Sequence, residues 1–265
     1  MKKDFSFQFS TSPVKLVSSY PSGSMTVPDL NPPFILSFDQ KIDPEAVLKT
    51  IQLKGNNSKN GGKLVLLSEE EVKKNKHLKW IHSNALPSQW MAFKLSSELE
   101  KNTNYTLQIG PGTPSTEGNR LTTSAINVNF KTYPPFSIIR TSPSTETYKA
   151  SPKGTWNIFF SNEIDQNTIS KDKITVKPDC DGIAITSSGT GITIRNYSKE
   201  KTDYTVTVSK ELKDIYNQSL TGKDNVVFRV GERTPNPSID APRGMFVYDP
   251  MISPPVHNVI VKFLF

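Results

Sequence analysis

The sequence predicts an all-β protein of two tandem β-sandwiches, with a short helix inserted in the first and the start of a further β unit at the end. Three observations lead to this fold. An internal repeat divides the chain into two copies, short segments alternate between apolar and polar residues, and turn residues separate these segments. One sandwich takes roughly 100 residues, so a chain of 265 residues accommodates two.

The repeat is visible at both ends of each copy. Near the front, residues 34–43 resemble residues 156–165 at an offset of 122. Near the back, residues 103–109 resemble residues 202–208 at an offset of 99. The first copy therefore carries about 23 extra residues in its middle.

The second copy shows the strand pattern most clearly, and seven short strands in roughly 95 residues are typical of an immunoglobulin-like sandwich. The segment Gly189-Thr190-Gly191 between two alternating runs indicates a hairpin. Tyr105 and Tyr204 begin the penultimate strand of each copy, where a tyrosine hydroxyl often bonds back to the chain; an ordinary strand aromatic is the alternative. The expected strands lie near 137–141, 155–161, 173–177, 183–187, 191–195, 203–208 and 225–230.

The extra residues of the first copy carry the clearest helix signal. Ser68 and Glu71 have the spacing of a capping box, and acidic residues precede lysines, as the helix dipole favours. We therefore expect a short surface helix near 68–83. Its apolar stripe is imperfect and consists of Val72, Leu78 and Ile81.

After residue 231 the chain becomes turn-rich over 233–237, and residues 245–248 and 259–265 are then predicted to form two strands of a further β unit. A natural end on an apolar strand would be an aggregation hazard, so we expect that the sequence is cut short. Two prolines at 134–135 join the copies and restrict the link between them. The predicted parts are a disordered N-terminus (1–12), a first immunoglobulin-like domain (13–133), a second (134–232) and the start of a truncated third β domain (233–265).

No pattern for catalysis, metal binding or cofactor binding stands out. We therefore predict no enzyme, no catalytic, cofactor-binding or metal-binding residues, and no cofactor. His77 and His82 lie five residues apart, which does not place them on one helix face, and no acidic cluster adjoins them in the sequence. These two residues and His257 are expected to be surface histidines.

Cys180 is the one cysteine, so it cannot form a disulfide within the chain. The neighbouring Asp179 and Asp181 would raise the pKa of its thiol, and we expect it to be inert. Acids also recur beside the second strand of each copy. These acids are Asp39, Asp43 and Asp165. We expect them to cap turns, and a calcium site is the alternative.

The net charge of +7 comes mostly from scattered lysines. There is no arginine-rich stripe interleaved with aromatic residues, so we predict no nucleic-acid partner. No stretch approaches the roughly 18 apolar residues of a membrane span, and no signal peptide is visible at the start.

Each copy opens with a Pro-Ser turn and a strand that ends near a phenylalanine, which resembles the bacterial Ig-like modules of S-layer-type surface proteins. The first copy resembles, more specifically, the N-terminal region of bacterial α2-macroglobulin-like proteins. The resemblance spans about 14–265, and the segments that carry it are 66–71, 90–94, 105–118 and 130–136.

This resemblance implies non-catalytic scaffold modules of an envelope-anchored or secreted peptidase trap. In that family the complete chain traps peptidases through a bait region, and many members carry a Cys-x-Glu-Gln thioester; this chain contains neither. The implied partners are downstream macroglobulin-type domains, and peptidases or envelope components. The implied location is extracytoplasmic, in the periplasm, at the cell surface or secreted.

Two other readings stay open. In the second reading, the chain is a stand-alone cell-surface adhesion module that binds a glycan or a protein, with Trp80 and Trp90 as the contact residues to test. Trp90 lies on an alternating strand, however, and is expected to belong to the core. The third reading is an accessory module split from a secreted enzyme.

Overall fold

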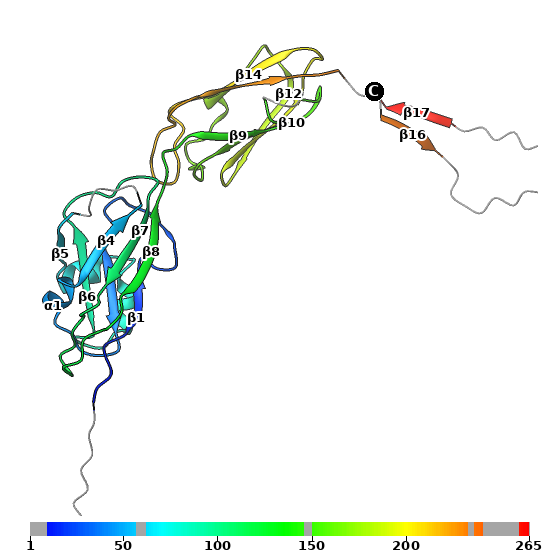
Figure 1. Cartoon of the computed structure of the whole chain (residues 1–265). Coiled ribbons are helices and arrows are strands. Elements are labelled where there is room, and N and C mark those ends of the chain that lie inside the picture. Colours follow the sequence, from blue (N-terminus) through cyan, green and yellow to red (C-terminus); the bar gives the residue numbers. More distant parts are fainter. Residues whose placement is uncertain (1–9, 57–61, 146–149, 233–235, 241–259, 265) are drawn as a thin grey trace, which may run out of the picture. The chain divides into compact units, whose positions relative to one another are not determined.

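The computed structural model describes residues 10–56, 62–145, 150–232, 236–240 and 260–264 (Figure 1). The chain divides between Pro135 and Phe136 into two compact units. We call these units the first and the second domain and describe each by itself. Strands are the main regular elements of both, as expected from the sequence.

The first domain is a sandwich of two four-stranded sheets, β1-β3-β6-β5 and β2-β8-β7-β4. The short strand β2 runs parallel to β8, and the other described pairs are antiparallel. The strands are β1 (Leu16–Tyr20), β2 (Thr26–Val27), β3 (Phe34–Phe38), β4 (Ile51–Gly55), β5 (Leu64–Leu66), β6 (Trp90–Leu95), β7 (Asn104–Ile109) and β8 (Ile126–Thr132).

Alternation along the strands builds the core between these two sheets. In β7 and β8 every second side chain is buried, so one face of each strand packs inward and the other faces solvent. Phe34 lies at the centre, stacked on Phe93 at 5.0 Å between ring centroids and edge-on to Phe130 at 5.5 Å. β3 is buried along its whole length, which indicates that both faces of its sheet are covered.

The second domain has sheets of order β12-β13-β10-β9 and β11-β14-β15, and all seven expected strands are present. The two-residue loop Gly189–Thr190 joins β12 to β13 with Ser188 opposite Gly191, which confirms the expected hairpin. The elements are β9 (Ile138–Ser142), β10 (Lys153–Phe160), the 3₁₀ turn η1 (Lys171–Lys173), β11 (Ile174–Lys177), β12 (Asp181–Ser188), β13 (Gly191–Tyr197), β14 (Asp203–Val208) and β15 (Asn225–Arg229).

The core of the second domain is centred on Trp156, which is 1% exposed. Its indole stacks on Phe228 at 4.9 Å and lies 5.4 Å from the ring of Tyr204. Phe136 and Phe160 stack on each other in the same core. Each domain therefore buries its own set of aromatic residues, as a domain that folds independently requires.

Both copies contain the expected tyrosine corner. The hydroxyl of Tyr105 accepts a hydrogen bond from the backbone N–H of Glu100 at 2.9 Å. The hydroxyl of Tyr204 accepts one from the N–H of Lys199, also at 2.9 Å. In each case the donor lies five residues upstream, so the repeat extends to this hydrogen bond.

The insert in the first copy consists of two helices, α2 (Glu69–Lys74) and α3 (Lys79–Asn84), so the expectation of one helix over 68–83 was wrong. The capping box at Ser68 is present. The helix ends at Asn75, which has an extended backbone and whose side chain accepts a hydrogen bond from His77 N at 2.9 Å. A local side-chain bond of this kind competes with helix continuation.

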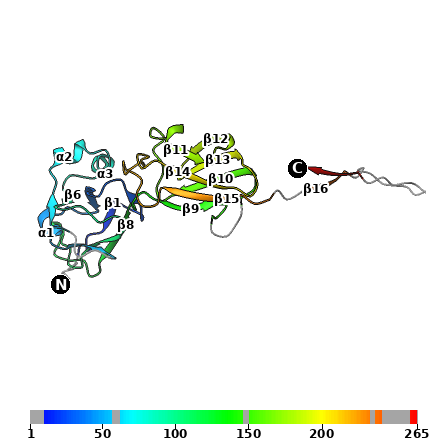
Figure 2. The same ribbon diagram turned by 90° about the horizontal axis from the view of Figure 1, so that it is seen from above.

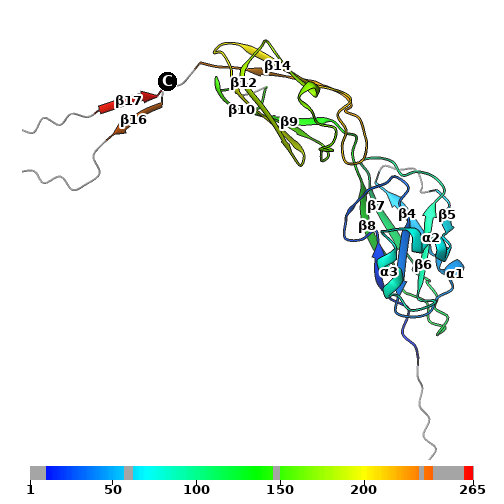
Figure 3. The ribbon, with the colours of Figure 1, turned by 180° about the vertical axis from the view of Figure 1, so that it is seen from behind.

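A further short helix, α1 (Pro44–Leu48), follows β3. Asp43 caps it by accepting from Glu45 N at 3.1 Å, so this acid has the predicted capping role. The insert itself lies on the outer side of the β1-β3-β6-β5 sheet (Figures 2 and 3). This position explains why β3 is buried on both faces.

Near the end of the chain, β16 (Asn236–Asp240) pairs with β17 (Ile260–Leu264). β17 matches the expected strand over 259–265. The expected strand over 245–248 lies outside the described residues, as does most of the N-terminal segment 1–12. Residues 236–237 were expected to form a turn but begin β16, where Pro237 is tolerated because a two-stranded sheet leaves an edge free on each strand.

Candidate binding site

The helical insert forms a second, small apolar core on the outer face of its sheet. Ile35 of β3 and Ala92 of β6 contact Val72, Leu78 and Ile81 of the insert. The imperfect stripe of the sequence is thus the face that packs. In the second domain a two-residue hairpin loop stands in place of the insert, so a sandwich of this kind folds without it.

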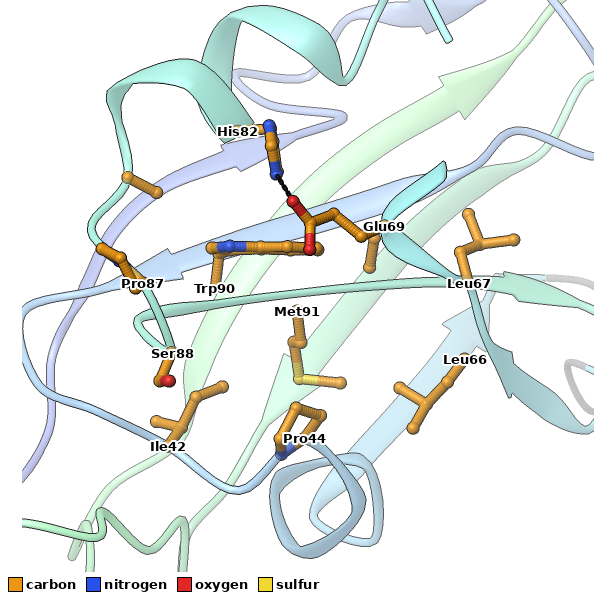
Figure 4. Close-up of a pocket in the computed structure, with 12 residues that line it drawn as sticks. Ile42, Pro44, Leu66, Leu67, Glu69, His82, Pro87, Ser88, Trp90 and Met91 are labelled. Carbon is orange, nitrogen blue, oxygen red and sulfur yellow. Dashed lines mark ion pairs between the residues drawn. The ribbon is translucent and has the colours of Figure 1, made fainter. Parts of the chain in front are cut away.

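A pocket of about 530 Å³ opens where the insert meets the sheet (Figure 4). This volume lies within the range of roughly 300–1,000 Å³ that ligand pockets occupy. Most of its lining is apolar, and the polar side chains are few. The lining residues are Ile42, Pro44, Leu66, Leu67, Glu69, His82, Ala85, Pro87, Ser88, Trp90, Met91 and Ala92.

The indole of Trp90 divides the apolar part of the pocket from the polar part. His82 lies edge-on against one face of the indole, with 4.7 Å between ring centroids and an angle of 80°. Figure 4 shows Pro44, Ile42 and Met91 on the other side of the ring. The second face of the indole is therefore turned toward an apolar space that a side chain or ligand can enter.

The polar wall consists of His82 and Glu69. His82 Nε2 lies 3.7 Å from a carboxylate oxygen of Glu69, and Lys73 Nζ lies 2.6 Å from the same oxygen. The hydrogen bond and charge of Lys73 lower the pKa of Glu69, which stays ionised at neutral pH. His82 was expected to be a surface histidine with no acidic cluster beside it in the sequence. Its side chain is only 15% exposed, and the packing of α3 against α2 brings it to Glu69.

The sheet edge beside the pocket is open. β5 pairs with β6 only as far as Leu66, which lies opposite Phe93. A last backbone bond runs from Leu67 N–H to the carbonyl of Ala92 at 2.8 Å, and the chain then turns into α2. Within the described part of the chain, no strand lies beside Trp90 on this side.

The other aromatic and histidine residues that the sequence singled out are dispersed. Trp80 is 70% exposed on α3 and does not line the pocket. Trp90 is half-buried and packs against the small core, as the alternating pattern predicted. His77 stacks on Tyr20 at 5.2 Å, and His257 lies outside the described residues.

Cys180 is half-buried, and burial is the main reason why the pKa of its thiol is raised. The charge of Asp181 adds to this effect, in the predicted direction. Little thiolate forms near neutral pH under these conditions, so the residue is a poor nucleophile.

Asp165 serves as a turn cap, as predicted, and accepts from Asn167 N at 3.0 Å. Asp39 was expected to cap a turn, but it accepts from the backbone N–H of Lys15 at 2.7 Å, 24 residues earlier in the chain. Among the described residues, no three His, Cys, Asp or Glu side chains gather closely enough to hold a metal ion. Asp214 was not singled out from the sequence; it is 1% exposed, and its carboxylate accepts hydrogen bonds from Asn162, Tyr216 and Gln218.

Comparison with protein families matches the bacterial Ig-like domain over residues 10–132 and again over residues 133–230. One relative is circularly permutated Ras protein 2 of Dictyostelium discoideum, 29% identical over 131 residues. That match covers 48% of this chain and 3% of the relative, so the chain spans a very small part of the relative's length.

Solved structures to which the chain is similar include the I9–I11 tandem of titin, with a TM-score of 0.36, 13% identity and coverage of 86% of this chain and 68% of that one. Escherichia coli α2-macroglobulin, domains MG0-NIE-MG1, has a TM-score of 0.29 at 9% identity, and the match covers 88% of this chain and 76% of that one. The N-terminal part of the bacterial S-layer protein SbsC has a TM-score of 0.28 at 13% identity, and the match covers 83% of this chain and 45% of that one.

Within the described segments, no helix is both long and apolar enough to cross a membrane.

Proposed function

We propose, from the fact that this chain belongs to the bacterial Ig-like domain family, that its two domains are non-catalytic scaffold modules of a longer extracytoplasmic protein. Domains of this family are generally non-catalytic. Our finer proposal is that the longer protein is a peptidase trap of the α2-macroglobulin-like kind, with these modules at its front.

The way in which the two domains are joined carries the scaffold proposal. The carbonyl of Tyr133 accepts from Asn102 N at 3.0 Å within the first domain. The carbonyl of Phe136 accepts from Thr221 N at 2.8 Å within the second. Only the prolines 134–135 separate these two anchored residues, so each domain holds its own end of a very short link. A spacer that positions other domains needs such a connection.

The peptidase-trap proposal is supported by the sequence resemblance, whose segments lie at the end of β5 and the start of α2, on β6, on β7 and after it, and from the end of β8 onward. Its partners would be macroglobulin-type domains further along the chain, together with peptidases. Trapping would depend on a bait segment, which these two domains do not supply.

The test begins with the coding sequence on both sides of this segment. We expect an upstream export signal and a downstream continuation that contains a bait segment. The whole encoded protein should then suppress casein cleavage by a panel of endopeptidases, whereas residues 10–232 alone should not. Absence of a bait-containing continuation, or undiminished casein cleavage by every peptidase in the presence of the whole protein, would refute the trap and leave the scaffold proposal standing.

A second candidate function is a binding module, and the pocket beneath the insert favours it. An insert that the second domain lacks builds an apolar pocket with convergent polar groups, and binding sites are commonly added to a common fold in this way. Loss of ligand binding on filling the pocket would establish this role.

A further inference from the structure

We infer that the pocket of the first domain binds an extended peptide, which adds a short strand beside Trp90 of β6 and places a large aliphatic side chain beneath the indole. A basic residue next to that side chain would face Glu69. This inference deepens the binding-module function and rests on it, and it is independent of the peptidase-trap proposal.

The backbone of β6 provides the first argument. In an antiparallel ladder, residues two positions apart direct their N–H and C=O groups to the same side. The carbonyl of Ala92 points toward β5, because it accepts from Leu67 N–H. The N–H and C=O of Trp90 therefore point to the same side, where β5 has turned away and the pocket begins. An added strand would pair with these groups, as in other complexes formed by strand addition.

The lining of the pocket provides the second argument. Ile42 and Met91 are almost fully buried and lie below the indole, and Leu66 and Pro44 complete the apolar lining on that side. Side chains of an added strand point alternately to the two faces of the sheet. One residue of the peptide would thus enter the apolar space, as recognition by backbone pairing and a side-chain pocket requires.

Charge complementarity gives the third argument. The whole chain has a net charge of +7, yet no Lys or Arg lines the pocket, and the lining includes the carboxylate of Glu69. This carboxylate is held at the rim by Lys73 and His82 and stays ionised. A cationic or neutral occupant is therefore favoured over an anionic one.

A glycan fits the same pocket less well. Sugar recognition relies on an accessible aromatic face together with several polar side chains. Here His82 lies against one face of Trp90, so a single face is left for stacking, and it is turned toward an apolar space. The polar side chains of the lining are Glu69, His82 and Ser88, and the first two already contact each other.

The test starts with selection of a phage-displayed library of linear heptapeptides on the two-domain chain. Counter-selection uses Ala85→Phe, which fills the pocket from the end of α3, and Ser83→Phe, on exposed α3 surface outside the lining, is the matched control. We expect enriched peptides with an aliphatic residue next to Lys or Arg. Binding of a synthetic enriched peptide should weaken about tenfold or more with Ala85→Phe, and less than about twofold with Ser83→Phe. Unchanged thermal unfolding of both variants would show that they fold.

Backbone methylation tests the binding mode. Methylating the peptide nitrogen that faces Trp90 should weaken binding about tenfold, while methylating the next nitrogen, which points away, should not. The amide exchange of Trp90 should slow on binding. Binding that depends on Ala85 but ignores both methylations would overturn strand addition and leave the binding module intact. If no peptide is enriched over the counter-selection, a peptide is not the ligand, whether or not the chain binds cellohexaose. If neither a peptide nor cellohexaose binds, the binding-module function is refuted as well.

Discussion

The paired tyrosine corners allow a sharp test of how each domain is stabilised. Tyr105→Phe deletes one hydroxyl and keeps the ring, which stacks on Phe130 at 5.4 Å. The lost bond is the one from Glu100 N–H at 2.9 Å, and the tyrosine itself is only 2% exposed. Removing the acceptor of a shielded N–H costs about 1–3 kcal/mol. A central value of about 2 kcal/mol corresponds to a decrease of roughly 6–10 °C in Tm for a domain of this size.

The same domain offers a control with the opposite expectation. Tyr20→Phe removes another shielded hydroxyl, but this one has no hydrogen-bond partner among the described residues. Its removal should leave the stability unchanged or raise it, because no partner is left behind. Tyr204→Phe should destabilise the second domain by about as much as Tyr105→Phe destabilises the first.

Urea unfolding of the two-domain chain, followed by amide NMR resonances assigned to each domain, would measure these changes. Each corner variant should lower the urea midpoint of its own domain, because each domain has its own core. Equal effects of Tyr105→Phe and Tyr20→Phe would refute the reasoning, since burial of a hydroxyl and not its hydrogen bond would then decide the outcome.

Four further predictions follow from the two domains. Asp214→Ala removes a buried acceptor of several hydrogen bonds and should lower the unfolding free energy of the second domain by about 3 kcal/mol or more in urea titration. Gly182→Ala should cost about 1–2 kcal/mol or more in the same assay, because its φ is +65° and a Cβ there would collide with the ring of Tyr197. Because the thiol pKa of Cys180 is raised, iodoacetamide at pH 8 should modify it more slowly than free cysteine, with a rate that still rises above pH 9; mass spectrometry would measure this. Replacing residues 67–89 by Gly-Thr, the loop of the second domain, should leave a folded but less stable first domain that no longer binds the selected peptides, as circular dichroism and a binding assay would show.

Strands and tyrosine corners were predictable because their signals are local and occur twice. Strict alternation in 203–208 predicts a half-buried strand whatever lies around it, and β14 occupies the same residues. The repeat adds independent support, since Tyr105 and Tyr204 occur in matched contexts. Each then makes the same hydrogen bond to a residue five positions upstream.

The division of the insert and the pocket could not be read from local patterns. The capping box at Ser68 indicates the start of α2, but its end at Asn75 depends on a side-chain bond that competes with continuing the helix. The pocket brings together Ile42, Glu69, His82 and Trp90, which come from four separate elements or loops. Only the packing of α3 on α2 places the histidine near the carboxylate, so their spacing of 13 residues in the sequence carried no signal.

The two copies act as an internal comparison that separates what folding needs from what it does not. Both have an aromatic core, a tyrosine corner and two packed sheets, so these features are explained by the sandwich itself. The insert is different, because the second domain joins the equivalent strands with two residues. Ordering residues 67–89 costs conformational entropy, and burial of apolar surface in the small core around Val72 and Ile81 opposes that cost. An element that the sandwich does not require, and that builds the pocket described above, is where a function specific to this chain should be sought first.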